Sequence, residues 1–345
     1  MENYGIRGHA NMFFRSYLTN RKQYTVIGNN SSKISGISSG VPQGSVLGPL
    51  LFLIYVNDLH RCLNESLVRL FADDTGLHMA HSNLNDLIAI AKVEISNLFK
   101  WCIANNLTIN YSKTNFVIIR ARRKKIPTDF KEIVINDIHI ERVSSAKYLG
   151  IILDEHLSWS EHVSHVCKSL MKFFGIFNHI KSYVTKKIAR QLYFAFIYSR
   201  ISYGLEIYGN CSKTLLTKIQ NIQNKLLKIL TRQDYLTPTN EIHKSLNVLK
   251  VKDIQSLNII CFVKKCILNT CPEYFYTYFK KRSSVYPIRN LGLQVKGANT
   301  ATGDLSIQIL GAQLWNDLPD ELKSKYHQVN FRKITAKYLI GKYTS

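Results

Sequence analysis

Residues 38–75 read SSGVPQGSVLGPLLFLIYVNDLHRCLNESLVRLFADDT, and two patterns within them indicate the fold. The first is the glycine-flanked segment Gly40–Gly44, which precedes a long apolar run. Pro49 suits the start of a helix, because its missing N–H would have no intrahelical partner there. This pattern predicts a loop that ends near Gly48, followed by a helix that runs to Leu59.

The second pattern is Phe71–Asp74 (FADD), in which two adjacent carboxylates separate apolar stretches. The stretches Leu67–Ala72 and Thr75–Ala80 predict a β-hairpin with Asp73 and Asp74 at its tip. Such carboxylates can chelate Mg²⁺, a hard cation that proteins usually hold through few carboxylates. Two such ions about 4 Å apart stabilise the attacking and leaving oxygens of a phosphoryl displacement, so the pair suits nucleotidyl transfer. The alternative is two acidic residues in a solvated turn.

The remaining amino-terminal part mixes strands with packed helices. Apolar residues at three- and four-residue steps predict a helix over Leu84–Cys102. Asn136–Asp137 predicts the turn of a second hairpin, and Lys147–Leu153 reads as a strand with Gly150 as a candidate bulge. The mixture implies an α+β domain over residues 1–158.

The composition changes after residue 158. Residues 162–205 contain seven Lys or Arg and no Asp or Glu, and their apolar spacing is helical, with Ser160 as the predicted N-cap. Residues 159–235 are therefore predicted to form a helical region. Residues 236–345 are predicted to form further helices and a small mixed tail.

The charge balance indicates a polyanionic partner. The chain has 345 residues and a formal net charge of +23, with 46 Lys and Arg against 23 Asp and Glu. Nucleic acid is favoured over an anionic membrane, because no segment reads as a cationic amphipathic helix beside an anchor. The longest apolar run, Leu50–Val56, is too short to span a bilayer.

The cysteine pattern indicates reduced thiols. The seven cysteines are scattered and odd in number, and the amino terminus lacks the apolar core of a secretory signal. An intracellular protein, cytoplasmic or nuclear, is therefore expected. His162, His165 and Cys167 lack the paired spacing of a zinc site, as do the cysteines between residues 261 and 271.

Several ordered segments closely resemble reverse transcriptases of non-LTR retrotransposons of the jockey- and CR1-like lineages. They are residues 38–52, 55–59, 71–75, 107–114 (LTINYSKT), 147–151 (KYLGI) and 314–319 (LWNDLP). The resemblance implies a partial polymerase palm, an antiparallel sheet with packed helices, over residues 1–158. It implies that the basic helices of residues 159–235 form a thumb. The implied activity is RNA-directed DNA synthesis with two Mg²⁺ ions, an RNA template, a DNA primer and dNTPs.

The resemblance also assigns roles to the residues of the first two patterns. Asp73 would ligate both metal ions, and Asp74 would be its weaker neighbour. The loop beneath the templating base and the incoming nucleotide would be formed by Gly40, Pro42, Gln43 and Gly44. A helix-entry turn is the alternative for Gln43.

Further roles fall on later residues. Lys113 would lie near the triphosphate, although a solvated lysine at a strand end is an equal alternative. The hairpin that grips the primer end would be formed by Tyr148, Leu149 and Gly150. The nucleic-acid-binding surface would carry Lys168, Lys172, Lys181, Lys186, Lys187 and Arg190. No protein partner is indicated.

One departure from the family pattern concerns the metal site. In this family a second metal-binding aspartate lies upstream of the segment that matches Tyr4–Gly8, and no aspartate precedes Asp58 in this sequence. Asp58 lies at the far end of the predicted helix and cannot replace it. We therefore expect an amino-terminally truncated relative that does not polymerise alone. The alternatives are a non-catalytic nucleic-acid-binding or domesticated protein, or a remnant whose sheet lacks a strand and does not fold stably.

Overall fold

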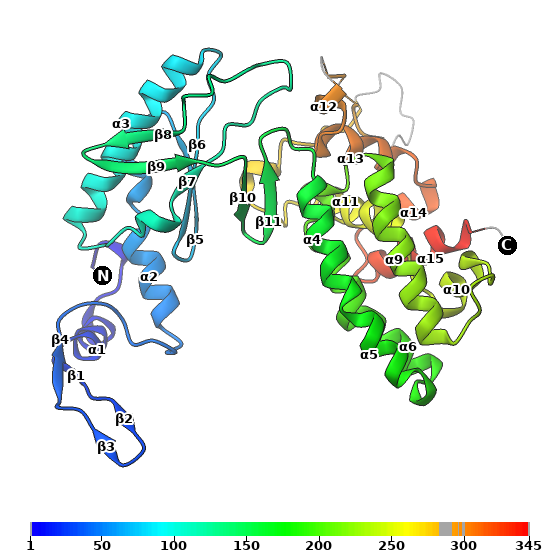
Figure 1. Ribbon diagram of the computed structural model, residues 1–345, viewed down its shortest axis with the longest axis horizontal. Helices are drawn as coiled ribbons and strands as arrows, with labels where there is room; N and C mark the ends of the chain where they lie inside the picture. The colour runs from blue at the N-terminus through cyan, green and yellow to red at the C-terminus, as the bar shows by residue number, and fades with distance from the viewer. Residues whose placement is uncertain (1, 283–291, 296, 299–300, 344–345) are drawn as a thin grey trace. The chain divides into compact units, whose positions relative to one another are not determined.

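The computed structural model describes residues 2–282, 292–295, 297–298 and 301–343, which group into two compact units (Figure 1). The first unit comprises Met1–Asn115 and Thr128–Arg142, and the second comprises Phe116–Pro127 and Val143–Ser345. Helices and small antiparallel sheets both occur. The mixed helix-and-strand class predicted from the sequence is therefore confirmed.

The first unit contains helices, short strands and 3-10 turns. Its helices are α1 (Gly8–Leu18), α2 (Gly48–Val56) and α3 (Leu84–Ala104), with 3-10 turns η1 (Glu2–Tyr4), η2 (Leu59–Cys62) and η3 (Tyr111–Lys113). Its strands are β1 (Arg21–Gln23), β2 (Val26–Ile27), β3 (Asn30–Ser31), β4 (Ser35–Ile37), β5 (Leu67–Phe71), β6 (Asp74–His78), β8 (Glu132–Ile135) and β9 (Ile138–Arg142). Strand β7 (Asn115–Phe116) lies at the junction of the two units.

Strands β5 and β6 form the hairpin predicted at the FADD pattern. They pair antiparallel from Leu67 opposite His78 to Phe71 opposite Asp74, so the connection is the two-residue turn Ala72–Asp73. Ala72 adopts a φ of 51°, which is costly for a residue with a side chain and typical of tight hairpin turns. The backbone of the turn therefore fixes both carboxylates at the tip.

Helix α3 begins where its cap and its apolar spacing predict. The Asn83 side chain accepts a hydrogen bond from Asn85 N at 2.8 Å, which satisfies one of the unpaired N–H groups of the first turn. Ala91, Ile95 and Phe99 are buried at four-residue steps on the face that packs in the core of the first unit. The other buried apolar residues of this unit are Leu51, Val56, Leu59, Cys102, Ile133, Ile135 and Ile140.

A buried carboxylate on α3 escaped the sequence analysis. Glu94 is 1% exposed, and its carboxylate accepts hydrogen bonds from Asn64 N at 3.1 Å, Ser66 N at 3.1 Å and Ser66 Oγ at 2.5 Å. Burial alone would raise the pKa of Glu94, but these hydrogen bonds outweigh it and hold the pKa below its ordinary value. Glu94 thus ties the segment that leads into β5 to α3.

Replacing Glu94 with Gln should lower the free energy of unfolding of the first unit by about 2 kcal/mol, because charge-assisted hydrogen bonds to buried donors are lost. Because the folded pKa is depressed, this stabilisation is complete above the ordinary Glu range and is lost as pH falls through the folded pKa. Hydrogen exchange of the α3 amides should report the change. Glu65→Gln, at an exposed side chain of the same segment, is the control, and equal exchange in both variants would contradict the prediction.

Two further hairpins differ in how well the sequence predicted them. The turn Asn136–Asp137 has φ values of 47° and 62° and joins β8 to β9, as predicted. The single strand that the apolar pattern predicted over Lys147–Leu153 is wrong, whereas a hairpin at Tyr148, Leu149 and Gly150, which the resemblance implied, is present. Leu149 and Gly150 have φ values of 46° and 83°, and these two successive left-handed residues make a turn between β10 (Ser145–Tyr148) and β11 (Ile151–Asp154) in place of a bulge.

The second unit is mainly helical. Its helices are α4 (Ser160–Met171), α5 (Phe173–Ile180), α6 (Lys186–Leu192), α7 (Ser199–Ser202), α8 (Leu205–Tyr208), α9 (Lys213–Thr231), α10 (Thr239–Leu246), α11 (Val251–Ile267), α12 (Ala301–Asp304), α13 (Ile307–Asn316), α14 (Asp320–Ser324) and α15 (Phe331–Gly341). Short 3-10 turns lie at η4 (Lys181–Tyr183) and η6 (Glu273–Phe275), and the π-helical segment η5 (Tyr193–Tyr198) joins α6 to α7.

Two hydrophobic cores hold this unit together. The larger core packs the inner faces of α4–α11 with Ile151 of β11, and Val163, Leu170, Ile197 and Leu226 within it are wholly or almost wholly buried. The smaller core joins α11 to α13, α14 and α15 around Trp315 and Phe331. Burial of this extent makes the helical unit the better-packed part of the described chain.

The start of α4 corrects the predicted N-cap. Ser160 is the first helical residue, and the capping position is Trp159, whose φ is 64°. The Asp154 carboxylate accepts hydrogen bonds from Ser158 N at 3.0 Å and Trp159 N at 2.9 Å, so a residue of β11 stabilises the entry to the helix.

None of the helices in the described part of the chain combines the length and the apolar character that a bilayer crossing requires.

Candidate functional site

The two adjacent carboxylates of the candidate metal site are exposed to solvent. Asp73 lies in the β5–β6 turn, and Asp74 is the first residue of β6, opposite Phe71. Carboxylate oxygens suit Mg²⁺, which commonly keeps several waters and takes one or two protein carboxylates together with phosphate oxygens of a substrate. Across residues 2–282 and the described segments beyond them, no three His, Cys, Asp or Glu side chains gather closely enough to hold one ion. The donor set therefore fits one side of a magnesium site.

The GVPQG loop is held by side chains that the sequence analysis did not single out. Gly40 and Gly44 adopt φ values of 78° and 76°, which favour glycine. The Arg21 guanidinium donates to Ser39 O at 3.1 Å and to Gly40 O at 2.5 Å. These contacts fix the start of the loop on the strand β1.

The end of the same loop is fixed by Ser45. Its hydroxyl donates to Pro42 O at 2.8 Å and accepts from Gly48 N at 2.9 Å, so it joins the loop to the first turn of α2. Gln43 lies between these anchors with its side chain exposed. The loop therefore presents an amide on a fixed backbone.

Lys113 is the last residue of η3, and its side chain is exposed. The ring of Tyr111, at the start of η3, packs edge-on against Phe99 of α3 with centroids 5.4 Å apart, which fixes the turn on the first unit. Gln43, Asp73 and Lys113 thus all belong to the first unit. No hydrogen bond or ion pair joins any two of these three within the described residues.

The residues predicted to grip a primer lie in the second unit. Tyr148 ends β10, and Leu149 and Gly150 form the turn before β11. Strand β11 packs against α4 (Figure 1). His162 Nδ1 of α4 accepts a hydrogen bond from Ile152 N at 3.3 Å. Burial and the neighbouring His165 lower the pKa of His162, which favours the neutral ring that accepts this hydrogen bond.

The basic surface of α4–α6 carries one acidic side chain, Glu161 in the first turn of α4, and none from residue 162 onward. All six predicted nucleic-acid contacts are exposed: Lys168, Lys172, Lys181, Lys186, Lys187 and Arg190. Arg190 also has a structural role, because its Nε donates to Leu246 O at 3.0 Å and its guanidinium lies 4.8 Å from the Phe194 ring centroid. The five lysines therefore provide the cleaner test of electrostatic binding.

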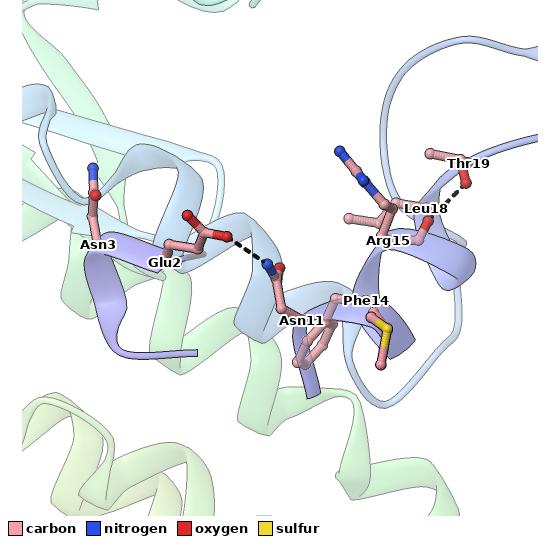
Figure 2. A pocket seen from close by; sticks show the side chains of 8 residues that line it. Glu2, Asn3, Asn11, Phe14, Arg15, Leu18 and Thr19 are labelled. Atoms are coloured by element: carbon pink, nitrogen blue, oxygen red, sulfur yellow. Dashed lines mark hydrogen bonds between the residues drawn. The ribbon is translucent and has the colours of Figure 1, made fainter. Parts of the chain in front are cut away.

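A separate pocket lies on η1 and α1 of the first unit (Figure 2). Asn11 Nδ2 donates to Glu2 Oε1 at 3.0 Å across it, and Thr19 Oγ1 donates to Arg15 O at 2.8 Å at its far end. None of the predicted site residues lines this pocket. Its single carboxylate and mixed lining suggest no role in the chemistry expected at Asp73 and Asp74.

Comparison with known proteins agrees with the motifs. Residues 2–153 match the family described as reverse transcriptase (RNA-dependent DNA polymerase). The chain is 27% identical over 248 residues to the probable RNA-directed DNA polymerase from transposon X-element of Drosophila melanogaster, a match that covers 69% of this chain and 27% of that protein. The resemblance to jockey-like retrotransposon enzymes is therefore confirmed at low identity.

Two further Drosophila melanogaster proteins give similar matches. The probable RNA-directed DNA polymerase from transposon BS is 28% identical over 253 residues, and the RNA-directed DNA polymerase from mobile element jockey is 26% identical over 249 residues. Each match covers 69% of this chain and 27% of the relative. The chain thus spans about a quarter of the length of these relatives.

Proposed function

We propose that this chain takes part in RNA-templated DNA synthesis as a reverse transcriptase domain fragment that does not polymerise alone, since residues 2–153 match the reverse transcriptase family and the relatives are retrotransposon-type RNA-directed DNA polymerases. In that reaction the 3′-hydroxyl of a DNA primer attacks the α-phosphorus of a dNTP, and pyrophosphate leaves. The observation that carries the proposal is the pair of adjacent exposed carboxylates on the two-residue turn of β5–β6, inside the matched domain. Asp73 and Asp74 would hold Mg²⁺, which neutralises charge on the phosphate oxygens.

The other residues of the site have supporting roles in this proposal. Gln43, on the loop anchored by Arg21 and Ser45, would hydrogen-bond the nucleotide or the templating base. Lys113 would contact a phosphate oxygen of the triphosphate. The turn formed by Leu149 and Gly150 would contact the primer strand, and the lysines of α4–α6 would contact the phosphate backbone.

A second candidate function is nucleic-acid binding by a non-catalytic remnant or domesticated protein that takes no part in DNA synthesis. It is supported by the small donor set at the β5–β6 tip, since two adjacent like charges repel one another and hold a cation weakly without further ligands. The basic surface of α4–α6 is independent of that site, so binding and polymerisation are separable properties.

The purified 345-residue chain should give no extension of a DNA primer on an RNA template with Mg²⁺ or Mn²⁺, yet should retain the same primer–template on a filter at low salt. The first result is expected because no third His, Cys, Asp or Glu joins the Asp73–Asp74 pair among the residues that the structure describes, and the second because the basic surface of α4–α6 is present. Extension that Asp73→Ala abolishes would show that the metal site is complete in this chain. Failure to retain the duplex at low salt would contradict a role in RNA-templated synthesis.

A further inference from the structure

The Leu149–Gly150 turn is held by a tyrosine from a distant part of the second unit. Tyr203, at the end of α7, donates a hydrogen bond from its hydroxyl to Leu149 O at 2.6 Å. A Cβ atom added to Gly150 would lie 3.2 Å from Tyr203 Cε1, so the ring covers the glycine closely. The hydroxyl and the ring therefore hold adjacent residues of one turn.

The next residue of the chain completes this attachment. Gly204 has a φ of 67°, and a Cβ atom there would lie 2.5 Å from Ile151 Cδ1. Glycine thus allows the start of α8 to approach the first residue of β11. Ile151 is itself part of the larger hydrophobic core, so the hairpin and α7–α8 are joined on both sides of the turn.

Support of this kind is needed because the turn is strained. Leu149 adopts a φ of 46°, a conformation that residues with side chains rarely occupy without support from their surroundings. The hydrogen bond from Tyr203 is the long-range contact that accounts for this conformation at Leu149. Its removal would allow the turn to relax.

The exposure of Tyr203 shows that it is more than a core residue. Although its hydroxyl and one edge are engaged, the residue remains 58% exposed, and Ile207 of α8 is 51% exposed. Lys147, two residues before Leu149, and Arg200, three residues before Tyr203, are both exposed, and Glu206 of α8 is the acidic residue nearest to Tyr203 in sequence. An aromatic ring fixed in orientation on elements that carry exposed basic side chains suits contact with a nucleotide base or sugar.

We infer that Tyr203 positions the Leu149–Gly150 turn for contact with the primer strand, and that the exposed face of its ring forms part of that contact. This inference rests on the proposed function, since it identifies a residue that acts at the primer-binding hairpin. Tyr203 is thus a positioning residue through its hydroxyl and a binding residue through its ring.

The test uses the full chain and an RNA template–DNA primer duplex with 2-aminopurine at the primer 3′ end and a dye at the far end. Tyr203→Ala should weaken binding, measured by dye anisotropy, about tenfold, because an aromatic contact is lost. Tyr203→Phe keeps the ring and should change affinity less than about twofold, yet should make the 2-aminopurine emission change about twofold smaller because the turn is no longer held. Tyr274→Ala, at a tyrosine that is 61% exposed on η6 and outside α4–α8, should match the wild type in both measurements.

The outcomes separate this inference from the function on which it rests. The inference alone would be overturned if the wild-type chain binds the duplex with a change in emission and both Tyr203→Phe and Tyr203→Ala show the wild-type affinity and emission change. A wild-type chain that does not bind the duplex would overturn the proposed function as well. A thermal transition measured by circular dichroism confirms folding of each variant, and Tyr203→Phe keeps the test decisive where Tyr203→Ala does not fold.

Discussion

Replacing Lys168, Lys172, Lys181, Lys186 and Lys187 with Gln should lower the affinity for an RNA template–DNA primer duplex about 100-fold at ~0.1 M salt. The reason is electrostatic, because each lysine that contacts a phosphate releases condensed counterions when it binds. A loss of this size corresponds to about two or three of the five lysines contacting phosphates at one time. The slope of log affinity against log salt concentration should become shallower by about two or three as well. Filter binding over a series of salt concentrations measures both quantities.

The control for this experiment removes the same charge from a different part of the same unit. Lys280, Lys281, Lys325, Lys333 and Lys337 are also exposed, and changing them to Gln gives the same net charge as the first variant. Their removal should change affinity about threefold or less, because distant charges are screened at this salt concentration. Arg190 is kept in both variants because it bonds to Leu246 O. Equal losses in the two variants would show that net charge, and not the α4–α6 surface, drives binding.

The parts of the fold that the sequence predicted well are those determined by neighbouring residues. Asn136–Asp137 allows two successive positive φ values, and α3 follows from apolar residues spaced along one face together with the Asn83 cap. Both signals lie within a few residues of the structure they determine. The candidate carboxylates at Asp73–Asp74 were found for the same reason.

The parts that the sequence did not predict depend on residues far apart in the chain. The apolar pattern around Leu149 and Gly150 indicated a continuous strand, and only the family resemblance implied a hairpin there, because the support of the turn comes from the distant Tyr203. The role of Glu94 depends on backbone donors of residues 64 and 66, which no periodicity reveals. The roles of Gln43 and Lys113 at a common site stay predictions. Their exposed side chains make no contact with each other, and a bound substrate would be needed to bring them together.

A buried histidine of the second unit should make that unit sensitive to mild acid. His243 of α10 is fully buried, with Nδ1 3.2 Å from Val248 O and Nε2 3.0 Å from Asn224 Oδ1. Burial lowers its pKa to about 4, and Lys250 acts in the same direction, whereas the hydrogen bond to the Val248 carbonyl opposes the shift. Burial dominates because the charged imidazolium loses its hydration.

The sign of the effect follows from proton binding in the two states. In the unfolded chain His243 takes up a proton near pH 6.5, and in the folded chain only near pH 4, so the unfolded state binds more protons between these values. The free energy of unfolding should therefore fall as pH is lowered from 6.5 to 4, by about 3 kcal/mol in all. His162, whose pKa is also lowered by burial, should add to the slope in the same direction.

Urea unfolding of the full chain at intervals between pH 7 and pH 4.5, followed through the second-unit tryptophans Trp159 and Trp315, should show this loss. His243→Gln removes the titrating group, so the free energy of unfolding should depend much less on pH in this variant. His179→Gln, at an exposed position of α5, should keep the wild-type slope of the free energy of unfolding against pH. A stability that stays constant over this range in the wild type, or an NMR titration that places His243 near pH 6.5, would show that hydrogen bonding to the two oxygens outweighs burial. That result would make the imidazolium a stable part of the core, since both ring nitrogens would then donate to the oxygens they face.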